Sequence, residues 1–230
     1  MRLRWILVLV AVGVAIDKSD WTPPPAWIPW APLAIGDPVT PLTSFKLARL
    51  KGNPEACRAT LASAPDLRFT ALADTTVAGC PLSNIVRVTR SGVTFSSSYL
   101  ASCPLAVAWA LFERHGLEPA AQEELGASVE RVDHLGSFAC RNIYGRANAR
   151  RSEHASAEAL DVAGFVLDDG RRITLRQDWG EGAEGVFLKR VQRSACDVFG
   201  TTLGPDYNAA HADHFHLGVG TGLGVGGICR

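Results

Sequence analysis

Residues 102–116, SCPLAVAWALFERHG, contain the clearest helix of the chain. Ser102 is a good N-cap, Pro104 fits the first turn, and Gly116 is a typical helix end. The apolar side chains on one face of this helix are Leu105, Ala108, Trp109 and Phe112. Their spacing is that of a buried helix face, so we expect an α-helix from Ser102 to His115.

The segments around this helix show either helical spacing or strand patterns. Helices are expected over residues 55–62, 119–125 and 188–199, and strands over 129–135 and 214–219. Hairpins are expected from residues 85–88 with 93–95, and from 161–167 with 171–175 around Asp168-Asp169-Gly170. Helices come first and paired strands later, which predicts an α+β fold: a small antiparallel sheet that carries the functional site, flanked by helices.

The composition fits a folded protein without a nucleic-acid partner. Of the 230 residues, 47% are apolar, which is enough for a sizeable core. Lys+Arg and Asp+Glu both number 23, so the formal net charge is zero. Binding to nucleic acid normally needs a clustered basic surface, so we expect no nucleic-acid partner. The composition predicts no particular oligomeric state.

Residues 1–16 have the pattern of an export signal. Arg2 and Arg4 precede an apolar run from Trp5 to Ile16. This run is shorter than the roughly 17–25 residues of a free-standing transmembrane helix. We expect a cleaved signal peptide or a signal anchor that tethers the chain to the inner membrane through residues 5–16, with the domain in the periplasm. A cytosolic protein with a chance apolar start is the alternative.

Residues 17–44 are dense in proline and tryptophan. Proline favours an extended, semi-rigid chain, so this segment is predicted to be a spacer. Its tryptophans could instead pack on the domain or lie at a membrane interface. The globular domain is expected over residues 45–230.

Six cysteines support an oxidising compartment. They are Cys57, Cys80, Cys103, Cys140, Cys196 and Cys229. None forms a Cys-x-x-Cys pair, so three disulfides are predicted rather than a zinc knuckle. Six cysteines allow 15 pairings. The working prediction joins Cys57 to Cys80, Cys140 to Cys196 and Cys103 to Cys229.

Two stretches about fifty residues apart gather four of the six histidines. They are residues 152–161, SEHASAEALD, and residues 211–216, HADHFH. Imidazole and carboxylate groups suit Zn²⁺, which binds nitrogen and oxygen donors at about 2.0–2.2 Å. We therefore predict a zinc site held by His154, Asp161 and His216, with a fourth position for water.

The spacing constrains how these ligands could meet. Seven positions on a straight helix span about 10 Å along the axis, too far for one ion. The chain between His154 and Asp161 is therefore expected to fold back, with Asp161 at the start of the next strand. His214 and His216 are two residues apart, so on a strand both would face one side while Phe215 faces the other.

Catalysis at such a site needs a general base and a cation near the developing negative charge. His214, whose ordinary pKa is near neutrality, is the predicted base, and His211 is predicted to assist or hold it. Arg141 is predicted to stabilise the attacked carbonyl oxygen.

Plainer interpretations exist for several of these residues. His115 and His134 are interpreted as surface or core histidines, and Glu153 and Glu158 as solvated neighbours of the site. Residues 211–216 alone could be a solvated loop that binds metals adventitiously. Their combination with a second histidine and aspartate in an exported chain favours a metal site.

Five motifs lie in the second half of the chain: residues 136–141, GSFACR; 151–155, RSEHA; 159–161, ALD; 203–208, LGPDYN; and 211–216, HADHFH. Together they resemble the bacterial extensin-like C-terminal domain family. The resemblance covers about residue 45 to the C-terminus and is most specific after Ser102. That family is similar to zinc peptidases typified by lysostaphin, D-Ala-D-Ala carboxypeptidases and murein endopeptidases.

The resemblance implies roles for individual residues. The ligand pattern of those peptidases is Ser-x-His-x-x-Gly-x-Ala-x-Asp followed by His-x-His. It implies zinc ligation by His154, Asp161 and His216, with His214 as the base. Ala157 stands where that pattern has glycine, a departure that matters if the turn needs a positive φ.

The function implied is that of an exported zinc peptidase acting on peptidoglycan peptides, including bonds of D-amino acids. Arg141 corresponds in this resemblance to the arginine of a Ser-Gly-Tyr-Arg-like segment, and it is expected to steady the oxyanion or a substrate carboxylate. One alternative is a non-catalytic, metal-stabilised module that binds the cell wall, with His211 or His214 as a fourth ligand. Another is amide hydrolysis on a different substrate.

Overall fold

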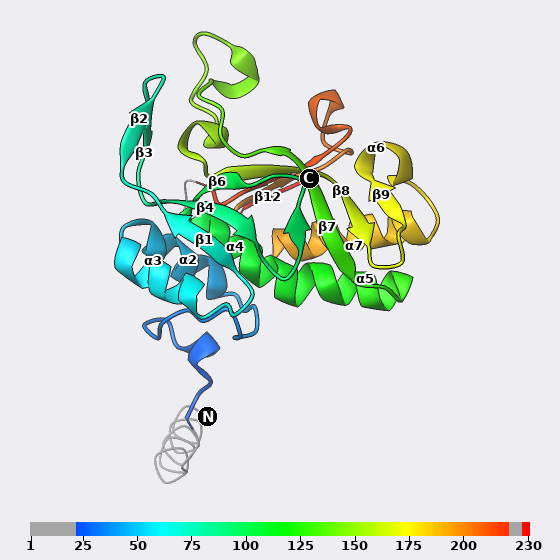
Figure 1. The fold of residues 1–230 in the computed structure, drawn as a ribbon, viewed down its shortest axis with the longest axis horizontal. Helices are drawn as coiled ribbons and strands as arrows, with labels where there is room; N and C mark the ends of the chain where they lie inside the picture. The colour runs from blue at the N-terminus through cyan, green and yellow to red at the C-terminus, as the bar shows by residue number, and fades with distance from the viewer. Residues whose placement is uncertain (1–21, 221–226) are drawn as a thin grey trace, which may run out of the picture.

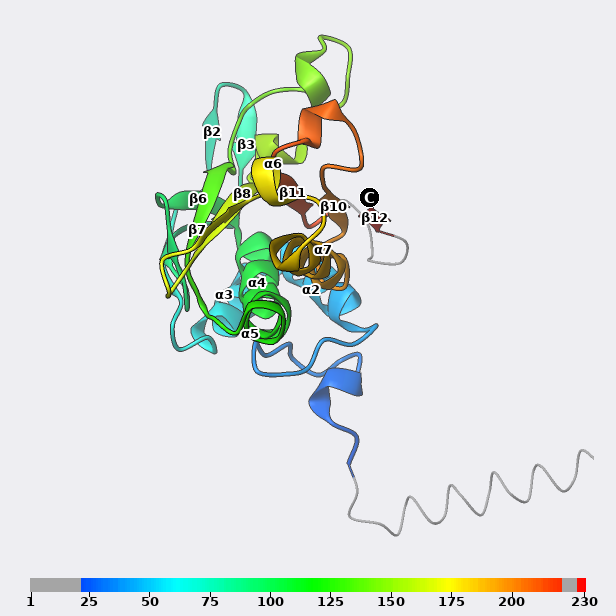
Figure 2. The ribbon, with the colours of Figure 1, turned by 90° about the vertical axis from the view of Figure 1, so that its right-hand side faces the viewer.

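The computed structural model describes residues 22–220 and 227–230. The predicted signal, residues 1–16, lies outside these ranges. The chain has mixed α+β architecture, with a layer of helices against one side of a central sheet (Figures 1 and 2). Within the described ranges, no helix combines the length and apolar character needed to cross a membrane.

The helices are α2 (Thr43–Lys51), α3 (Pro54–Ala62), α4 (Cys103–Phe112), α5 (Glu118–Leu125), α6 (Leu175–Asp178) and α7 (Ala183–Cys196). The short helical turns are η1 (Pro25–Trp27), η2 (Glu113–Leu117), η3 (Ile143–Gly145), η4 (Glu153–Ser156) and η5 (Ala209–His211). The strands are β1 (Arg68–Ala71), β2 (Thr75–Val77), β3 (Cys80–Leu82), β4 (Ile85–Arg90), β5 (Thr94–Phe95), β6 (Tyr99–Ser102), β7 (Val129–Gly136), β8 (Ala159–Leu167), β9 (Arg172–Thr174), β10 (Thr201–Leu203), β11 (Phe215–Gly218) and β12 (Ile228–Cys229).

The central sheet has the strand order β12-β10-β11-β8-β7-β5, and β9 pairs with β8. Its inner strands β10, β11, β8 and β7 are antiparallel, whereas the outer strands β12 and β5 pair in parallel with β10 and β7. Two smaller antiparallel sheets, β1-β4-β6 and β2-β3, complete the fold. The predicted small antiparallel sheet is therefore larger and partly mixed, but the α+β class is confirmed.

Helix α4 begins as the sequence predicts and ends differently. The Ser102 side chain accepts a hydrogen bond from the amide of Leu105, and all ten residues of the helix are buried. Gly116 does not end the helix, because the chain continues through the π turn η2 into α5. A Cβ at Gly116 would lie 2.7 Å from Cβ of Ser194 on α7, so this glycine serves close helix packing instead.

One of the two predicted hairpins is wrong. Strand β4 pairs with β1 and β6, and β5 crosses to pair in parallel with β7. Local alternation predicts strands but not their partners, and β5 pairs with β7, which lies beyond α4 and α5 in the chain. The second hairpin, β8 with β9, is confirmed by the pairing of Phe165 with Ile173.

The predicted disulfide pairing is also wrong. The bonds join Cys57 to Cys103, Cys80 to Cys140, and Cys196 to Cys229, with Cα–Cα distances of 6.1, 5.7 and 5.6 Å. The first links α3 to the start of α4, the second links the β2-β3 hairpin to the loop after β7, and the third holds β12 to the end of α7. Each bridge follows tertiary contacts between elements that the spacing of the cysteines does not reveal.

The described part of the predicted spacer packs on the domain. Leu33 and Ile35 are buried in the main core. The Lys46 ammonium on α2 donates a hydrogen bond to the carbonyl of Pro25 at 2.6 Å, and the Thr40 hydroxyl donates to the carbonyl of Ala26. The proline-rich segment from residue 25 onward is therefore part of the folded body rather than a free linker.

Candidate metal centre

A tight turn brings the first histidine stretch back onto the sheet. His154 lies in η4, and Ala157 follows with a left-handed backbone, φ 52° and ψ 35°. The chain then enters β8, in which Asp161 is the third residue. The predicted reversal between His154 and Asp161 is confirmed, and its turn has a positive φ at an alanine rather than at a glycine.

The sheet places the second histidine stretch beside this turn. His216 on β11 is the cross-strand partner of Asp161 on β8, and such partners share one face of a sheet. Their neighbours Phe215 and Leu217 are buried in the core on the opposite face. Strand alternation therefore turns the carboxylate and the imidazole away from the helices and toward the loops over the sheet.

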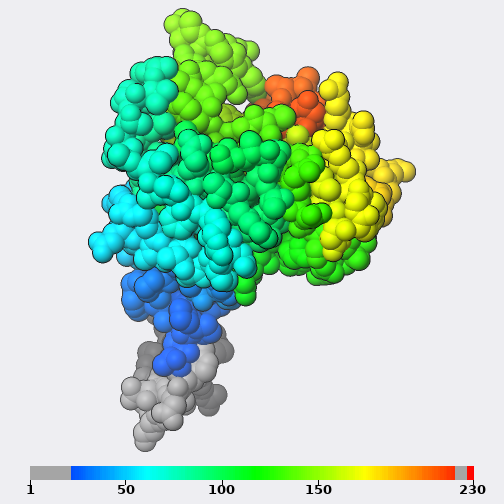
Figure 3. All heavy atoms as spheres, viewed as in Figure 1, coloured from blue at the N-terminus to red at the C-terminus, as the bar shows by residue number. Residues whose placement is uncertain are grey.

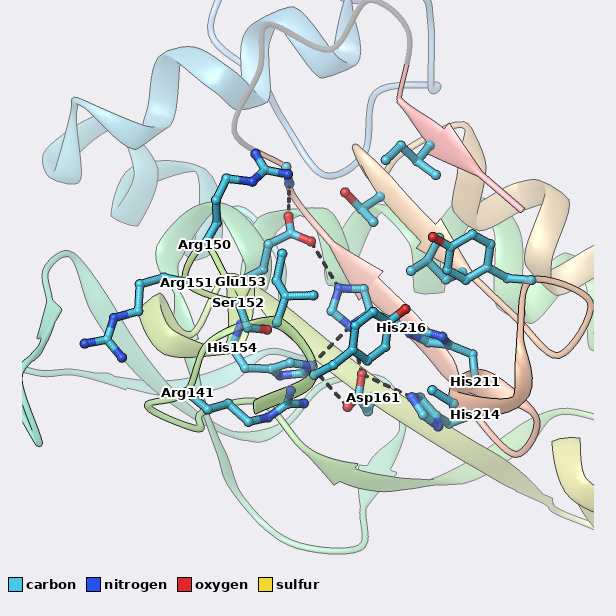
Figure 4. Close-up of a pocket in the computed structure, with 18 residues that line it drawn as sticks. Arg141, Arg150, Arg151, Ser152, Glu153, His154, Asp161, His211, His214 and His216 are labelled. Atoms are coloured by element: carbon cyan, nitrogen blue, oxygen red, sulfur yellow. Dashed lines mark hydrogen bonds and ion pairs between the residues drawn. The ribbon is translucent and has the colours of Figure 1, made fainter. Parts of the chain in front are cut away.

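His154, Asp161 and His216 form a compact group in which one possible ligand atom of each lies within 4.8 Å of the others. His154 Nε2 is 3.1 Å from His216 Nδ1 and 3.1 Å from Asp161 Oδ2, and His216 Nδ1 is 3.0 Å from Asp161 Oδ1 (Figure 4). Zinc with bonds of 2.0–2.1 Å in tetrahedral geometry holds its ligand atoms about 3.3 Å apart. The group therefore has the dimensions of a zinc site.

When the two imidazoles are neutral, their outer hydrogen bonds leave the inner nitrogens as acceptors. His154 Nδ1 lies 2.9 Å from the Ser137 carbonyl, which can only accept, so Nδ1 carries the proton. His216 Nε2 lies 3.0 Å from Oε2 of Glu153, which likewise accepts. Neutral imidazoles would thus direct two lone pairs and a carboxylate into one space, which is the donor set that a cation such as Zn²⁺ binds.

The ionisation of this group follows from the same contacts. Burial would raise the pKa of Asp161, but the contacts of its carboxylate with the imidazoles of His154 and His216 outweigh it and hold this pKa well below its usual value. Burial would lower the pKa of His216, but hydrogen bonds to Asp161 and Glu153 outweigh it and raise this pKa to about 9. Without a metal, a second proton on His216 therefore partly compensates the negative charges of Asp161 and Glu153.

This raised pKa predicts a pH dependence for the metal-free protein. His216 titrates near 6.5 when unfolded and near 9 when folded, so its contribution is complete below pH 6.5 and is lost as the pH rises through 9. We expect the free energy of unfolding in EDTA to fall by about 2–3 kcal/mol between pH 6 and pH 9.5. Urea titrations at both pH values measure it. His216→Asn should lose this slope; equal slopes in both proteins would contradict the prediction.

His214 and His211 lie beside the group without joining it. His214 precedes β11, with Nδ1 3.0 Å from Asp213 Oδ1 and Nε2 3.8 Å from Asp161 Oδ1. His211 Nδ1 is 2.9 Å from the side-chain oxygen of Asn208. Burial, together with the neighbouring His214 and His216, lowers the pKa of His211 to about 4, so it is neutral at pH 7. Both rings can accept or pass a proton through Nε2.

These side chains line a cleft of about 510 Å³. Arg141, Arg150 and Arg151 line it together with the four histidines, and the Arg141 guanidinium points toward the group around Asp161 (Figure 4). The loop over residues 138–152 projects from the body of the protein beside the segment over residues 205–214 (Figure 3). The Asn208 amide donates to the Tyr144 hydroxyl at 3.0 Å and so connects these two walls.

The two other histidines lie elsewhere, as the sequence suggested. His115 Nε2 is 2.9 Å from the Ile35 carbonyl, and His134 Nε2 is 2.9 Å from the Ser97 carbonyl. The interpretation of Glu153 and Glu158 as solvated is wrong. Glu153 contacts His216, and Glu158 is 9% exposed and pairs with Lys51. Both face inward because η4 folds the chain back over β11.

Comparison with known proteins gives one family assignment. No curated protein and no solved structure matches the chain. A family model described as "Extensin-like protein C-terminus" matches residues 55–230, which is more than half of the chain and includes every residue of the centre. The chain therefore belongs to the extensin-like protein C-terminus family.

Proposed function

We propose that this protein is an exported zinc metallohydrolase that cleaves peptide bonds, including those of D-amino acids, in cell-wall peptidoglycan. The observation that carries the proposal is the convergence of His154 Nε2, His216 Nδ1 and the Asp161 carboxylate beside an open cleft. The disulfides support export, because such bonds persist in oxidising compartments. The apolar run over residues 5–16 would supply the signal or the membrane tether.

His154, Asp161 and His216 would hold the metal. Zinc held by three protein side chains polarises a carbonyl group and activates water for attack near neutral pH. The Ser137 carbonyl and the Glu153 carboxylate orient the two imidazoles. Among the described residues this group has three possible protein ligands, which favours a catalytic site over the closed four-ligand shell of a structural one.

The residues around the metal would supply proton transfer and charge. His214 would take a proton at Nε2 and pass it to the leaving amine, since Asp213 fixes its Nδ1–H. His211, which is neutral at pH 7, would assist His214 or hold its ring in place, since the centroids of the two rings are 5.2 Å apart. Arg141 would stabilise the developing oxyanion or bind a substrate carboxylate.

The substrate class rests on the likeness of the Ser152–Asp161 and His214–His216 motifs to those of peptidoglycan peptidases. The cleft also suits an extended anionic peptide, because three arginines line it. The non-catalytic wall-binding module remains the rival, and it differs in requiring no bond cleavage.

Purified, disulfide-bonded protein loaded with zinc tests the proposal directly. Incubated with isolated peptidoglycan or muropeptides, it should hydrolyse a peptide bond and so release an amino acid or a peptide, and mass spectrometry should identify the shortened stem peptides. EDTA should stop the release and added zinc should restore it. Release of no product by protein that carries one zinc per chain would contradict hydrolysis of this substrate and favour the binding module.

A further inference from the structure

We propose that Glu153 is a positioning residue that fixes the orientation and tautomer of His216, so that Nδ1 rather than Nε2 faces the metal centre. This inference rests on the proposed metal site but not on hydrolysis. The Glu153 side chain is only 18% exposed and lies against the His216 imidazole.

The first step is the hydrogen-bond assignment at His216. Glu153 Oε2 is 3.0 Å from His216 Nε2, and a carboxylate can only accept, so this contact holds the proton on Nε2. The other nitrogen, Nδ1, is then free to face Asp161 Oδ1 at 3.0 Å and His154 Nε2 at 3.1 Å. An imidazole without this partner could rotate or exchange tautomers, and it would then present either nitrogen.

The second step is that Glu153 is itself held in place. Its other oxygen, Oε1, accepts the backbone N–H of Gly220 at 2.8 Å. Its carbonyl accepts the amide of Glu158, which closes the η4 turn. A carboxylate bound at both oxygens, on a turn bonded to the next strand, is a rigid support for the imidazole.

The third step is the space that β11 leaves for this carboxylate. A Cβ added at Gly218 would lie 2.5 Å from Oε2 and 2.8 Å from Oε1 of Glu153, and the three nearest atoms all belong to that side chain. Glu153 therefore lies against the bare backbone of the strand that carries His216. Glycine at position 218 is the feature that permits this contact.

Zinc affinity, measured by competition with a chromophoric chelator, tests the assignment. Groups that orient metal-bound histidines typically contribute 10- to 100-fold in metal affinity. We expect Glu153→Ala to weaken zinc binding by about that factor. Glu153→Gln, whose side-chain oxygen can still accept from Nε2–H, should recover most of it. Glu158→Gln is the matched control: this buried acid on the same turn contacts Ser156 and Lys51 but no imidazole, and zinc affinity should not change.

A double-mutant cycle separates positioning from a general effect on folding. Gly218→Ala should weaken zinc binding in the wild-type background, because its methyl group displaces the carboxylate. It should have little further effect beside Glu153→Ala, where no carboxylate remains to be displaced. Circular dichroism checks that each variant is folded; if Glu153→Ala is not, Glu153→Gln and Gly218→Ala carry the test.

Nitrogen-15 NMR of the imidazoles in zinc-loaded protein gives the second readout. Wild type should show His216 bound through Nδ1 with Nε2 protonated, and Glu153→Ala should show a mixture or a switch to Nε2. Zinc affinity of Glu153→Ala within twofold of wild type, with the Nδ1 signature intact, would overturn the assignment. So would a wild-type protein that binds no zinc. Absence of hydrolysis with these affinity changes intact would overturn the proposed function alone.

Discussion

Replacement of His154 with alanine is expected to reduce zinc affinity by more than about 100-fold, beyond the range for groups that only orient ligands. His154 is 4% exposed, and its Nε2 lies 3.1 Å from possible ligand atoms of both Asp161 and His216. The variant therefore loses one of three donors and leaves a pair that cannot enclose the ion. Metal analysis after dialysis should find about one zinc per chain in wild type and almost none in the variant.

His115→Ala is the control for this experiment, because His115 contacts the Ile35 carbonyl and is not among the residues that line the cleft. It should bind zinc as wild type does. Equal zinc content in wild type and His154→Ala would show that the metal, if bound, is held elsewhere, and the proposed site would fail.

Replacement of His214 with alanine is expected to leave zinc affinity nearly unchanged and to lower the rate of peptide release by about 100- to 10,000-fold, the usual contribution of a general base. His214 Nε2 is 3.8 Å from Asp161, outside the three-residue group. Its Nδ1 is bonded to Asp213, which orients the ring. Asp213→Asn should lower the rate less, because the imidazole remains.

The two measurements together distinguish the roles of His214. Loss of zinc from the His214→Ala variant would show that His214 is a fourth ligand, as the non-catalytic wall-binding module requires. An unchanged rate with zinc retained would remove it from the mechanism. A lower rate with zinc retained supports the base.

Much of the secondary structure could be predicted because its signals are local. The Ser102 cap and Pro104 placed the start of α4, and Asp168-Asp169-Gly170 placed the β8-β9 turn. The prediction that the helix ends at Gly116 is wrong, because a glycine that ends a helix and a glycine that allows a neighbouring helix to pack closely cannot be distinguished in sequence. Only the contact with Ser194 on α7 distinguishes them.

The three side chains of the candidate metal centre could be predicted from the sequence, but the contact of Glu153 with His216 could not. The spacing of His154 and Asp161 predicted that the chain folds back between them, and η4 with Ala157 makes that turn. The expected strand over residues 214–219 begins one residue later, at Phe215, so His214 precedes it. Glu153 could not be identified as a support, because an acid next to a histidine is ordinary on an exposed turn. Its role depends on the reversal at Ala157, which brings η4 over a strand more than fifty residues away.

The bridge from Cys80 to Cys140 has a practical consequence for anyone producing this protein. Cys140 precedes Arg141 directly, so the bond fastens one wall of the cleft to the β2-β3 hairpin. Chains made in a thiol-rich host cytosol would lack this fastening even when their core has formed. Inactivity of such a sample would then reflect its missing disulfide rather than the chemistry of the site. Secretion, or refolding with a glutathione redox couple, is the appropriate way to obtain the disulfide-bonded protein.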